Sequence, residues 1–313
     1  MTESNESERT PATVLDAPRA RTAALEAGYA SVHLFDSVDS TTTRARELLM
    51  NGTDADRESL GELSVFSALY QSDGRGRLAR PWTAPPGACL ATSIVVRPHA
   101  STEPGTRELP EDSYHWLTLV AGLSVVDIWR YYGAEAHLKW PNDVIANGAK
   151  GCGVLAQLVP ESGANEELRS IIVGIGQNTN MTAEQLPVPT ATSLRLCTGH
   201  TVDSTEVLER LLVAFARRYR AFLRAGGGPE AADPLTGAPS LLDAARAVCS
   251  TLGAEVAMSL PDGSVVRGVA EDMDAQGRIL IRREDGTLAP YAVGDIEHLR
   301  PANGSYGDFR PAH

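Results

Sequence analysis

Three short polar segments of the chain carry residue types suited to binding a phosphorylated ligand. The first, GRGRLARPW at 74–82, holds Arg75, Arg77 and Arg80 beside two glycines. Glycines let backbone N–H groups approach an anion closely, and forked guanidinium groups match phosphate or carboxylate oxygens. On spacing alone, a solvated basic loop is an equally good interpretation.

The second segment is KWPND at 139–143. Its proline fixes a turn, and Asn147-Gly148, the strongest hairpin signal in the chain, follows just before Lys150. The two lysines and the carboxylate suit a nucleotide with its metal ion. The alternative is a surface turn with a charge pair.

The third segment, VGIGQNTN at 173–180, is an apolar strand that opens into glycines and amides. Such a segment lets a ligand lie against the backbone while asparagine side chains read its polar edges. The signal is weak by itself, because its spacing is not that of a dinucleotide-binding fingerprint.

Alternating and amphipathic patterns predict the elements that position these segments. Hydrophobic periodicity and turn residues predict strands at 31–35, 63–70, 88–97, 137–140, 144–146, 152–159 and 171–175, and helices at 23–28, 40–50, 113–132, 203–223 and 240–249. Short strands separated by regularly spaced turns follow residue 253 and predict a small β-barrel.

The predicted elements divide the chain into two domains. We expect a poorly ordered tail at 1–28, a catalytic domain at 29–228, a small C-terminal β-domain at 240–302 and a tail at 303–313. The Gly- and Pro-rich stretch at 225–239 is the candidate boundary.

The composition restricts the functions open to the chain. Its formal net charge of -12 over 313 residues opposes binding to nucleic acid, although one local basic site remains compatible with a small phosphate ligand. There is no apolar run long enough to span a membrane and no signal-peptide pattern, so we expect a cytoplasmic protein. The four scattered cysteines are expected to be buried free thiols.

In this order and separation, the three segments together resemble those of the biotin protein ligases. The glycine and arginine loop is similar to the family's, KWPND is matched letter for letter, and the family's lysine beyond the hairpin corresponds to Lys150. The resemblance covers about residues 33–300. It implies an α+β fold, in which a mixed β-sheet flanked by helices, as in class II synthetases and lipoate ligases, precedes a small SH3-like β-barrel.

The resemblance also implies an activity. Such a ligase forms biotinyl-5'-AMP from biotin and ATP with Mg²⁺, then transfers biotin to a lysine of a biotin carboxyl carrier domain. Asp143 or Lys150 could assist loss of the acceptor lysine's proton. We also expect the loop at 73–82 to order over the adenylate.

Carried over residue by residue, the family's site falls on three groups of positions. Biotin is expected against Ser40, Thr41, Gln71, Gly74, Arg75, Gly76, Arg77 and Lys150. ATP or the adenylate is expected against Arg77, Arg80, Trp82, Lys139, Asn142 and Asn178, with Asp143 as the Mg²⁺ ligand and Lys150, Arg77 and Lys139 as the catalytic cations. Two departures from the family pattern are Thr42, where Asn is usual, and Leu78-Ala79, where Arg-Gly is often seen.

Three other functions remain as alternatives. A lipoate ligase-like acyl transferase would share the fold but lacks this pairing of motifs. A transcription regulator would need a winged helix-turn-helix, and only about 30 residues precede the first expected strand. A binding module without turnover would retain the site alone. We expect a monomer or a weak homodimer.

Overall fold

The larger of two β-sheets forms the centre of the chain. The computed structural model describes residues 12–77, 80–102, 104–106, 108–161, 169–260, 264–292 and, for the backbone, 298–301. Seven strands pair in the order β1-β2-β3-β7-β6-β5-β4. Their bounds are β1 Ser31–Phe35, β2 Leu63–Ala68, β3 Leu90–Val96, β4 Ala136–Lys139, β5 Asp143–Ala146, β6 Ala149–Pro160 and β7 Arg169–Gln177. Since β1 and β2 are parallel and the other neighbours antiparallel, the expected mixed sheet is confirmed.

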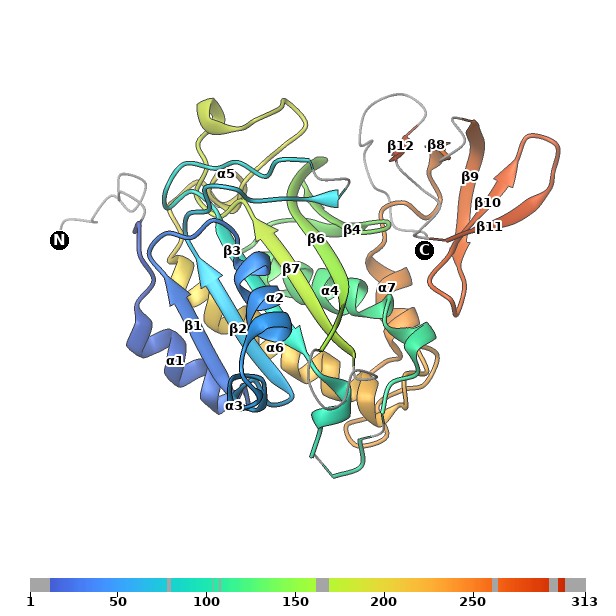
Figure 1. The fold of residues 1–313 in the computed structure, drawn as a ribbon. Coiled ribbons are helices and arrows are strands. Elements are labelled where there is room, and N and C mark those ends of the chain that lie inside the picture. The colour runs from blue at the N-terminus through green and yellow to red at the C-terminus, as the bar shows by residue number, and fades with distance from the viewer. Residues whose placement is uncertain are drawn as a thin grey trace.

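Helices cover both faces of this sheet (Figure 1). The long helices are α1 Ala17–Glu26, α2 Thr41–Asn51, α4 Trp116–Tyr131 and α6 Ser204–Arg224. Shorter ones are α3 Asp54–Ser59, η3 Pro98–Ala100, η4 Glu111–Ser113, η5 Ala183–Gln185 and α5 Leu194–Thr198. No helix in the described ranges combines the length and apolar character needed to cross a bilayer.

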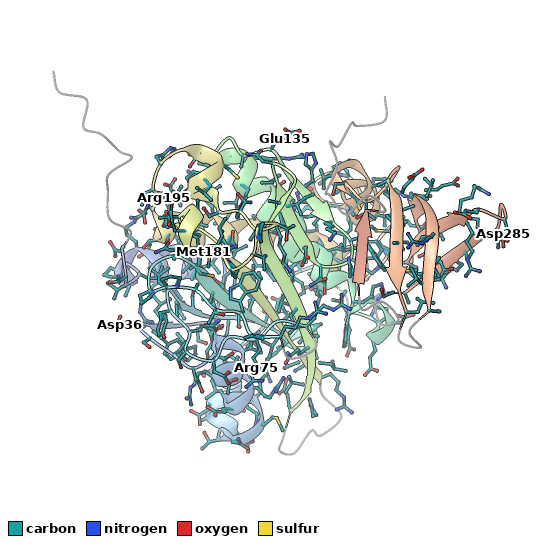
Figure 2. The ribbon with its side chains drawn as sticks, turned by 90° about the horizontal axis from the view of Figure 1, so that it is seen from above. Asp36, Arg75, Glu135, Met181, Arg195 and Asp285 are labelled. Atoms are coloured by element: carbon teal, nitrogen blue, oxygen red, sulfur yellow. The ribbon has the colours of Figure 1, made fainter. Side chains whose placement is uncertain are left out.

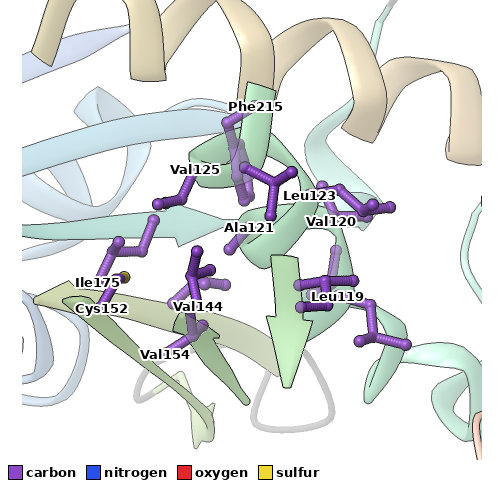
Figure 3. Packing of buried hydrophobic residues seen from close by; sticks show 14 of the residues in the cluster. Leu119, Val120, Ala121, Leu123, Val125, Val144, Cys152, Val154, Ile175 and Phe215 are labelled. Atoms are coloured by element: carbon purple, nitrogen blue, oxygen red, sulfur yellow. The ribbon is translucent and has the colours of Figure 1, made fainter. Parts of the chain in front are cut away.

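Alternate residues of each strand enter different cores, because strand side chains point to opposite faces in turn. Val65 and Val173 join the main core with α4 and α6, whereas their neighbours Phe66 and Ile172 join a smaller core with α2. Figure 3 shows the main core, where Leu123 and Val125 of α4 lie between Phe215 of α6 and sheet residues such as Val144 and Ile175. Helix α2 therefore packs on one face of the sheet, and α4 and α6 pack on the opposite face.

A buried cluster of charged residues lies just after the C-terminal ends of β3 and β6. The Arg97 guanidinium donates two bonds, 2.9 and 2.7 Å long, to the Glu161 carboxylate, and His99 Nε2 lies 3.3 Å from the same group. Burial raises the pKa of Glu161, but the hydrogen bonds from His99, Arg97 and Ser170 outweigh it and hold that pKa well below the ordinary value. This cluster supports strand ends that are remote from the cavity described below.

The second sheet lies beside the first, on the side where the chain ends (Figure 1). Helix α7, Leu241–Val248, leads into five antiparallel strands in the order β11-β10-β9-β8-β12. These are β8 Glu255–Ser259, β9 Val265–Met273, β10 Ile279–Arg283, β11 Leu288–Tyr291 and β12 His298–Pro301. Seen from above, Asp285 at the tip of this sheet lies at the opposite end of the molecule from Asp36 (Figure 2).

The fold class expected from the sequence is confirmed by the two sheets. The first falls within 29–228 and the second within 240–302, and those domain boundaries remain predictions. Expected turns at 276–277 and 285–286 join β9 to β10 and β10 to β11, whereas those at 262–263 and 294–295 and the tail at 303–313 lie outside the described residues.

The expectation of a poorly ordered tail across 1–28 is wrong for its second half. Asp16 caps α1 by accepting from the Arg19 N–H, and Ala20 and Ala24 are fully buried. The helix expected at 23–28 overlaps only the end of α1, which begins at Ala17, because small alanines between polar residues give a weak apolar period. Residues 1–11 lie outside the described part. The expected helix at 113–132 also starts later, at Trp116, after a 3-10 turn.

Candidate functional site

A cavity of about 450 Å³ opens on the α2 face of the large sheet. Small residues form its floor beside the apolar residues of the same face: Ser93 precedes Val95 in β3, and Gly174 and Gly176 follow Ile172 in the antiparallel strand β7. Because alternate residues share a face, replacing large side chains by small ones turns a packed surface into a pocket. The volume suits a small organic ligand.

A chain of hydrogen bonds forms the uncharged wall of the cavity. The Thr41 N–H donates to Gln71 Oε1 at 2.8 Å, and the Thr41 hydroxyl donates to the same oxygen at 3.1 Å. The Ser93 hydroxyl lies 2.8 Å from that of Thr41 and 2.9 Å from that of Thr42. Ser40 caps α2 through the Thr43 N–H and so holds the first turn of this helix in place.

The donor and acceptor in each of these hydrogen bonds follow from the Thr41 backbone N–H, which fixes the first of them. Since an N–H can only donate, the Gln71 atom that it meets is the amide oxygen, and the amide NH₂ group is left as the donor. The Thr41 hydroxyl gives its proton to Gln71, so Ser93 donates to Thr41 and Thr42 donates to Ser93. The wall thus offers donors at Gln71 and acceptor lone pairs at Thr42.

The KWPND segment and its hairpin form the charged wall. Asn147 and Gly148 both have positive φ, 50° and 74°, as a tight hairpin requires, and the turn returns Lys150 toward Asp143. Lys150 Nζ lies 2.7 Å from Asp143 Oδ1, and both side chains are mostly shielded from solvent. Lys139 is buried and also lines the cavity.

The glycine and arginine loop lies across the cavity as a small hairpin. The Trp82 N–H donates to Gly74 O at 2.8 Å, and the Gly76 N–H donates to Arg80 O at 2.8 Å. Arg77 Nη1 donates to Asn142 Oδ1 at 3.1 Å, which joins the loop to the KWPND segment. Leu78-Ala79, one of the departures from the family pattern, lies outside the described residues.

Trp82 lies on the cavity floor between the two walls. Its indole N–H donates to Cys89 Sγ at 3.3 Å, and a Cβ added to Gly176 would approach the ring to 2.8 Å. Lys150 Nζ is 5.7 Å from the ring centroid, within reach of a cation–π interaction. The flat indole therefore packs directly on β7 because glycine occupies position 176.

Nearly all of the predicted site residues come together in this cavity. Its lining includes Ser40, Thr41, Gln71, Arg75, Gly76, Arg77, Arg80, Trp82, Lys139, Asn142, Asp143, Lys150 and Asn178. Gly74 is next to it, held by Trp82. Arg75 and Met181, both lining residues, are labelled in Figure 2.

The geometry assigns local partners to several of these residues. The exposed Arg75 side chain pairs with Asp73 at 3.0 Å. Asn142 Nδ2 donates to Val154 O at 2.9 Å, and Asn178 Nδ2 donates to Thr192 O at 3.0 Å, so both amides hold the cavity wall. They position their neighbours even without a ligand.

Sequence reasoning missed Ser93 as a site residue and treated Thr42 only as a departure. The signal was present, because V-G-I-G in β7 alternates glycine with buried aliphatic residues, and Ser93 in β3 lies two positions before the buried Val95. The segment 187–191 was also missed; Lys150 joins it through a backbone bond of 2.8 Å to Thr190 O.

Burial shapes the electrostatics of the site. It lowers the pKa of Arg77 from its ordinary value, with Asp143 opposing that shift and Arg80 adding to it. Burial also raises the pKa of Cys89 to about 11, so this thiol stays protonated beneath Trp82. All four cysteines are free, as expected, with Cys197 part-buried and the other three buried.

Two family profiles match the chain. The Biotin/lipoate A/B protein ligase family matches residues 34–178, and the Biotin protein ligase C terminal domain matches residues 251–299. The first match spans the strands that build the cavity, from the end of β1 to the end of β7, and the second spans the small sheet.

Relatives and solved structures agree with these matches. The chain is 32% identical over 240 residues to the biotin--[acetyl-CoA-carboxylase] ligase of Mycobacterium tuberculosis, covering 75% of this chain and 79% of that protein. It is 32% identical over 198 residues to the bifunctional ligase/repressor BirA of Bacillus subtilis, covering 62% of this chain and 55% of that one. The structure of biotin protein ligase from Aquifex aeolicus in complex with biotin and ATP superposes with a TM-score of 0.63 at 26% identity, covering 87% and 98% of the two chains.

Proposed function

Because the chain belongs to the family of biotin protein ligases, we propose that it joins biotin to a lysine of a biotin carboxyl carrier domain with biotinyl-5'-AMP as intermediate. The observation that carries this proposal is one cavity with two unlike walls. A neutral wall of hydroxyls and an amide suits the uncharged ring of biotin, and a wall of Arg77, Lys139 and Lys150 suits phosphates.

The neutral wall is the biotin subsite in this proposal. A ureido group carries one carbonyl acceptor and two N–H donors, and the wall offers NH₂ donors at Gln71 and lone pairs at Thr42. Ser40 and Thr41 bring these groups together at the start of α2. The aliphatic part of biotin would lie toward Val154 and Ile175, which line the same cavity.

In the first half-reaction, a biotin carboxylate oxygen attacks the α-phosphorus of ATP and the bond to pyrophosphate breaks. Two anions approach one another, so the cations of Arg77, Lys139 and Lys150 lower the barrier by neutralising charge at phosphorus. Trp82 and Asn178 would hold the nucleotide base and sugar. No enzyme nucleophile is required.

In the second half-reaction, the neutral amine of the carrier lysine attacks the carbonyl carbon of the mixed anhydride, and AMP leaves with the bonding electron pair. The amine must first lose a proton, since its ordinary pKa is about 10.4. Asp143 and Lys150, which are paired at 2.7 Å, remain the two candidates for assisting that loss.

Mg²⁺ fits this site in a limited way. Among the described residues that line the cavity, Asp143 is the single carboxylate, and no cluster of three or more His, Cys, Asp or Glu occurs in the described ranges. Magnesium in nucleotide sites is commonly held by one or two carboxylates with the substrate phosphates, so Asp143 would hold it together with ATP. When bound, the ion would neutralise phosphate charge.

The test is the intact mass of a carrier domain after incubation with the protein, biotin and MgATP. We expect a biotin-sized gain that requires ATP and is strongly reduced by Lys150→Ala and Arg77→Ala. Arg217→Ala removes an exposed arginine on α6 and serves as the matched control with full activity. A gain only with lipoate would assign the sister activity, and biotin binding without any gain would assign a binding module.

Other expectations from the sequence remain predictions. We propose that the protein does not bind DNA, because a net charge of -12 opposes it, although the Bacillus relative is named a ligase/repressor. A gel shift at low salt would test this. We likewise propose that the protein is cytoplasmic, that it is a monomer or a weak homodimer, and that the loop at 73–82 orders over the adenylate.

A further inference from the structure

A turn of the small C-terminal sheet contacts the KWPND motif directly. The turn joins β9 to β10, and its Gly277 carbonyl accepts a bond of 2.9 Å from the Trp140 indole N–H. The neighbouring Ala275 carbonyl accepts a bond of 3.1 Å from the Trp116 indole N–H. Both indoles are 1% exposed, so these bonds are made inside the protein.

Hydrogen bonds within the turn itself also fix its conformation, independently of the two indoles. The Asp274 N–H donates to Arg278 O at 3.0 Å and the Gly277 N–H donates to Asp274 O at 2.8 Å. The Asp274 carboxylate accepts from the backbone N–H groups of Gln276 and Arg278 and pairs with the Arg278 guanidinium at 2.7 Å. Gly277 has a φ of +66°, which favours glycine.

A second set of bonds joins the same part of the motif to the segment before β8. The Trp140 N–H donates to Thr251 Oγ1 at 3.0 Å, and the Ser250 N–H donates to Leu138 O at 2.8 Å. Strand β4 is at the edge of the large sheet, and these bonds satisfy backbone groups that an edge strand would leave open. The C-terminal part therefore contacts both the Trp140 ring and the backbone at the end of β4.

Trp140 lines the cavity, and so do the residues on either side of it. Lys139 precedes it, and Asn142, which accepts a bond from Arg77, follows two positions later. Because Trp140 is fixed at both its backbone N–H and its ring, a change in the turn must move these neighbours or break a buried hydrogen bond. Reacting groups tolerate little displacement.

We infer that Trp140 is a positioning residue for adenylate formation, and that the turn at Asp274–Arg278 acts on the reaction by fixing its indole. The inference rests on the proposed function, because adenylate formation is the step that it affects. The small sheet is then part of the device that sets the cations against the ATP phosphates, although its turn lies outside the cavity lining. The neutral wall proposed for biotin, made by the start of α2, Gln71, β3 and β7, has no hydrogen bond to this turn among the described residues, so we expect biotin affinity not to depend on it.

The alternative is that the two indole bonds only stabilise the fold. Trp116 is a matched control, because it makes the same type of bond to the same turn but lies at the start of α4, away from the reacting groups. Phenylalanine at either position keeps an aromatic ring and removes the N–H donor. A purely structural role would give both variants the same kinetic behaviour.

The experiment compares Trp140→Phe, Trp116→Phe and the full-length wild type. Melting temperature, biotin affinity by calorimetry, and kcat for pyrophosphate release from ATP with biotin are measured for each. We expect similar falls in melting temperature for both variants and biotin affinity close to wild type. Only Trp140→Phe should lower kcat, by at least about tenfold, since a displacement of ~1 Å can cost ~100-fold.

A third variant, Asp274→Ala, loosens the turn without touching the motif and should lower kcat in the same manner. If Trp140→Phe does not fold, the kcat of Asp274→Ala tests the inference in its place. Equal kcat values for Trp140→Phe and Trp116→Phe, or an unchanged kcat for a folded Asp274→Ala, would overturn the inference. A wild type that releases no pyrophosphate would instead contradict the proposed function.

Discussion

Replacing Gly176 with alanine would test whether Trp82 defines the nucleotide end of the cavity. The added Cβ would lie 2.8 Å from Cε2 and 3.0 Å from Nε1 of the indole. Gly176 does not require a glycine backbone conformation, because its φ is outside the positive region. The effect of the substitution should therefore come from contact with the ring and not from strain in β7.

The size of the effect follows from that contact. Carbon atoms pack at about 3.5 Å, so a ring that now begins 2.8 Å away must move by roughly 0.7 Å. Such a movement also disturbs the indole bond to Cys89. Overpacking of this kind costs about 1–3 kcal/mol, and if that cost falls on nucleotide binding, the KM for ATP rises about 5- to 150-fold.

The assay is pyrophosphate release over a range of ATP at saturating biotin, with Gly174→Ala as the matched control. Gly174 lies on the same face of β7, but its Cβ would meet Thr42 Oγ1 at 3.0 Å instead of Trp82. We expect Gly174→Ala to raise the KM for biotin and Gly176→Ala the KM for ATP. If a folded Gly176→Ala left the KM for ATP unchanged, or if both variants affected the same substrate, the division of the cavity would be refuted.

Three other predictions follow from single contacts. Thr42→Val removes the last hydroxyl of the chain on Ser93 and should weaken biotin binding by about 1 kcal/mol, or roughly fivefold, in calorimetry, while Thr42→Ser retains the affinity. Asp143→Asn should raise the Mg²⁺ concentration needed for half-maximal adenylate formation by about tenfold or more, and an unchanged Mg²⁺ titration would exclude this carboxylate as the ligand. Because the pKa of Glu161 is depressed in the folded protein, its contribution to stability is complete above the ordinary value of 4.5 and falls as the pH drops below it. Urea unfolding should therefore show a smaller loss between pH 6 and about pH 3.5 in Glu161→Gln than in wild type.

Local patterns were sufficient to predict most of the large sheet and the motif residues. The Asn147-Gly148 turn fixes its hairpin through backbone conformations that few other residue pairs adopt, so the position of Lys150 beside Asp143 follows from nearby sequence. Ser40 behaves similarly as a helix cap. Such features depend on a few consecutive residues and are readable without knowledge of the rest of the chain.

Features that depend on distant partners could not be predicted. The bonds from Trp140 and Trp116 to the turn at 274–278 join residues more than 130 positions apart, and no local pattern specifies them. Helix α1 depends on α6 in the same way, through Arg19 and its partners Asp203 and Glu209. The hydroxyl chain likewise needs the pairing of β3 and β7 beneath α2 before Thr42 meets Ser93.

The pairing of charges within the cavity explains how a protein of net charge -12 can accept a polyanionic nucleotide. Lys150 is held by Asp143 and the Trp82 ring, and Arg77 by Asn142, so neither cation relies on bulk solvent alone for its orientation. In the proposed reaction, an incoming carboxylate or phosphate would take the place of Asp143 beside the half-buried Lys150, so one anion would replace another and the cation would stay paired. The displaced carboxylate would then be free to hold Mg²⁺ together with the ATP phosphates, so metal and substrate binding would be linked through the Lys150–Asp143 ion pair.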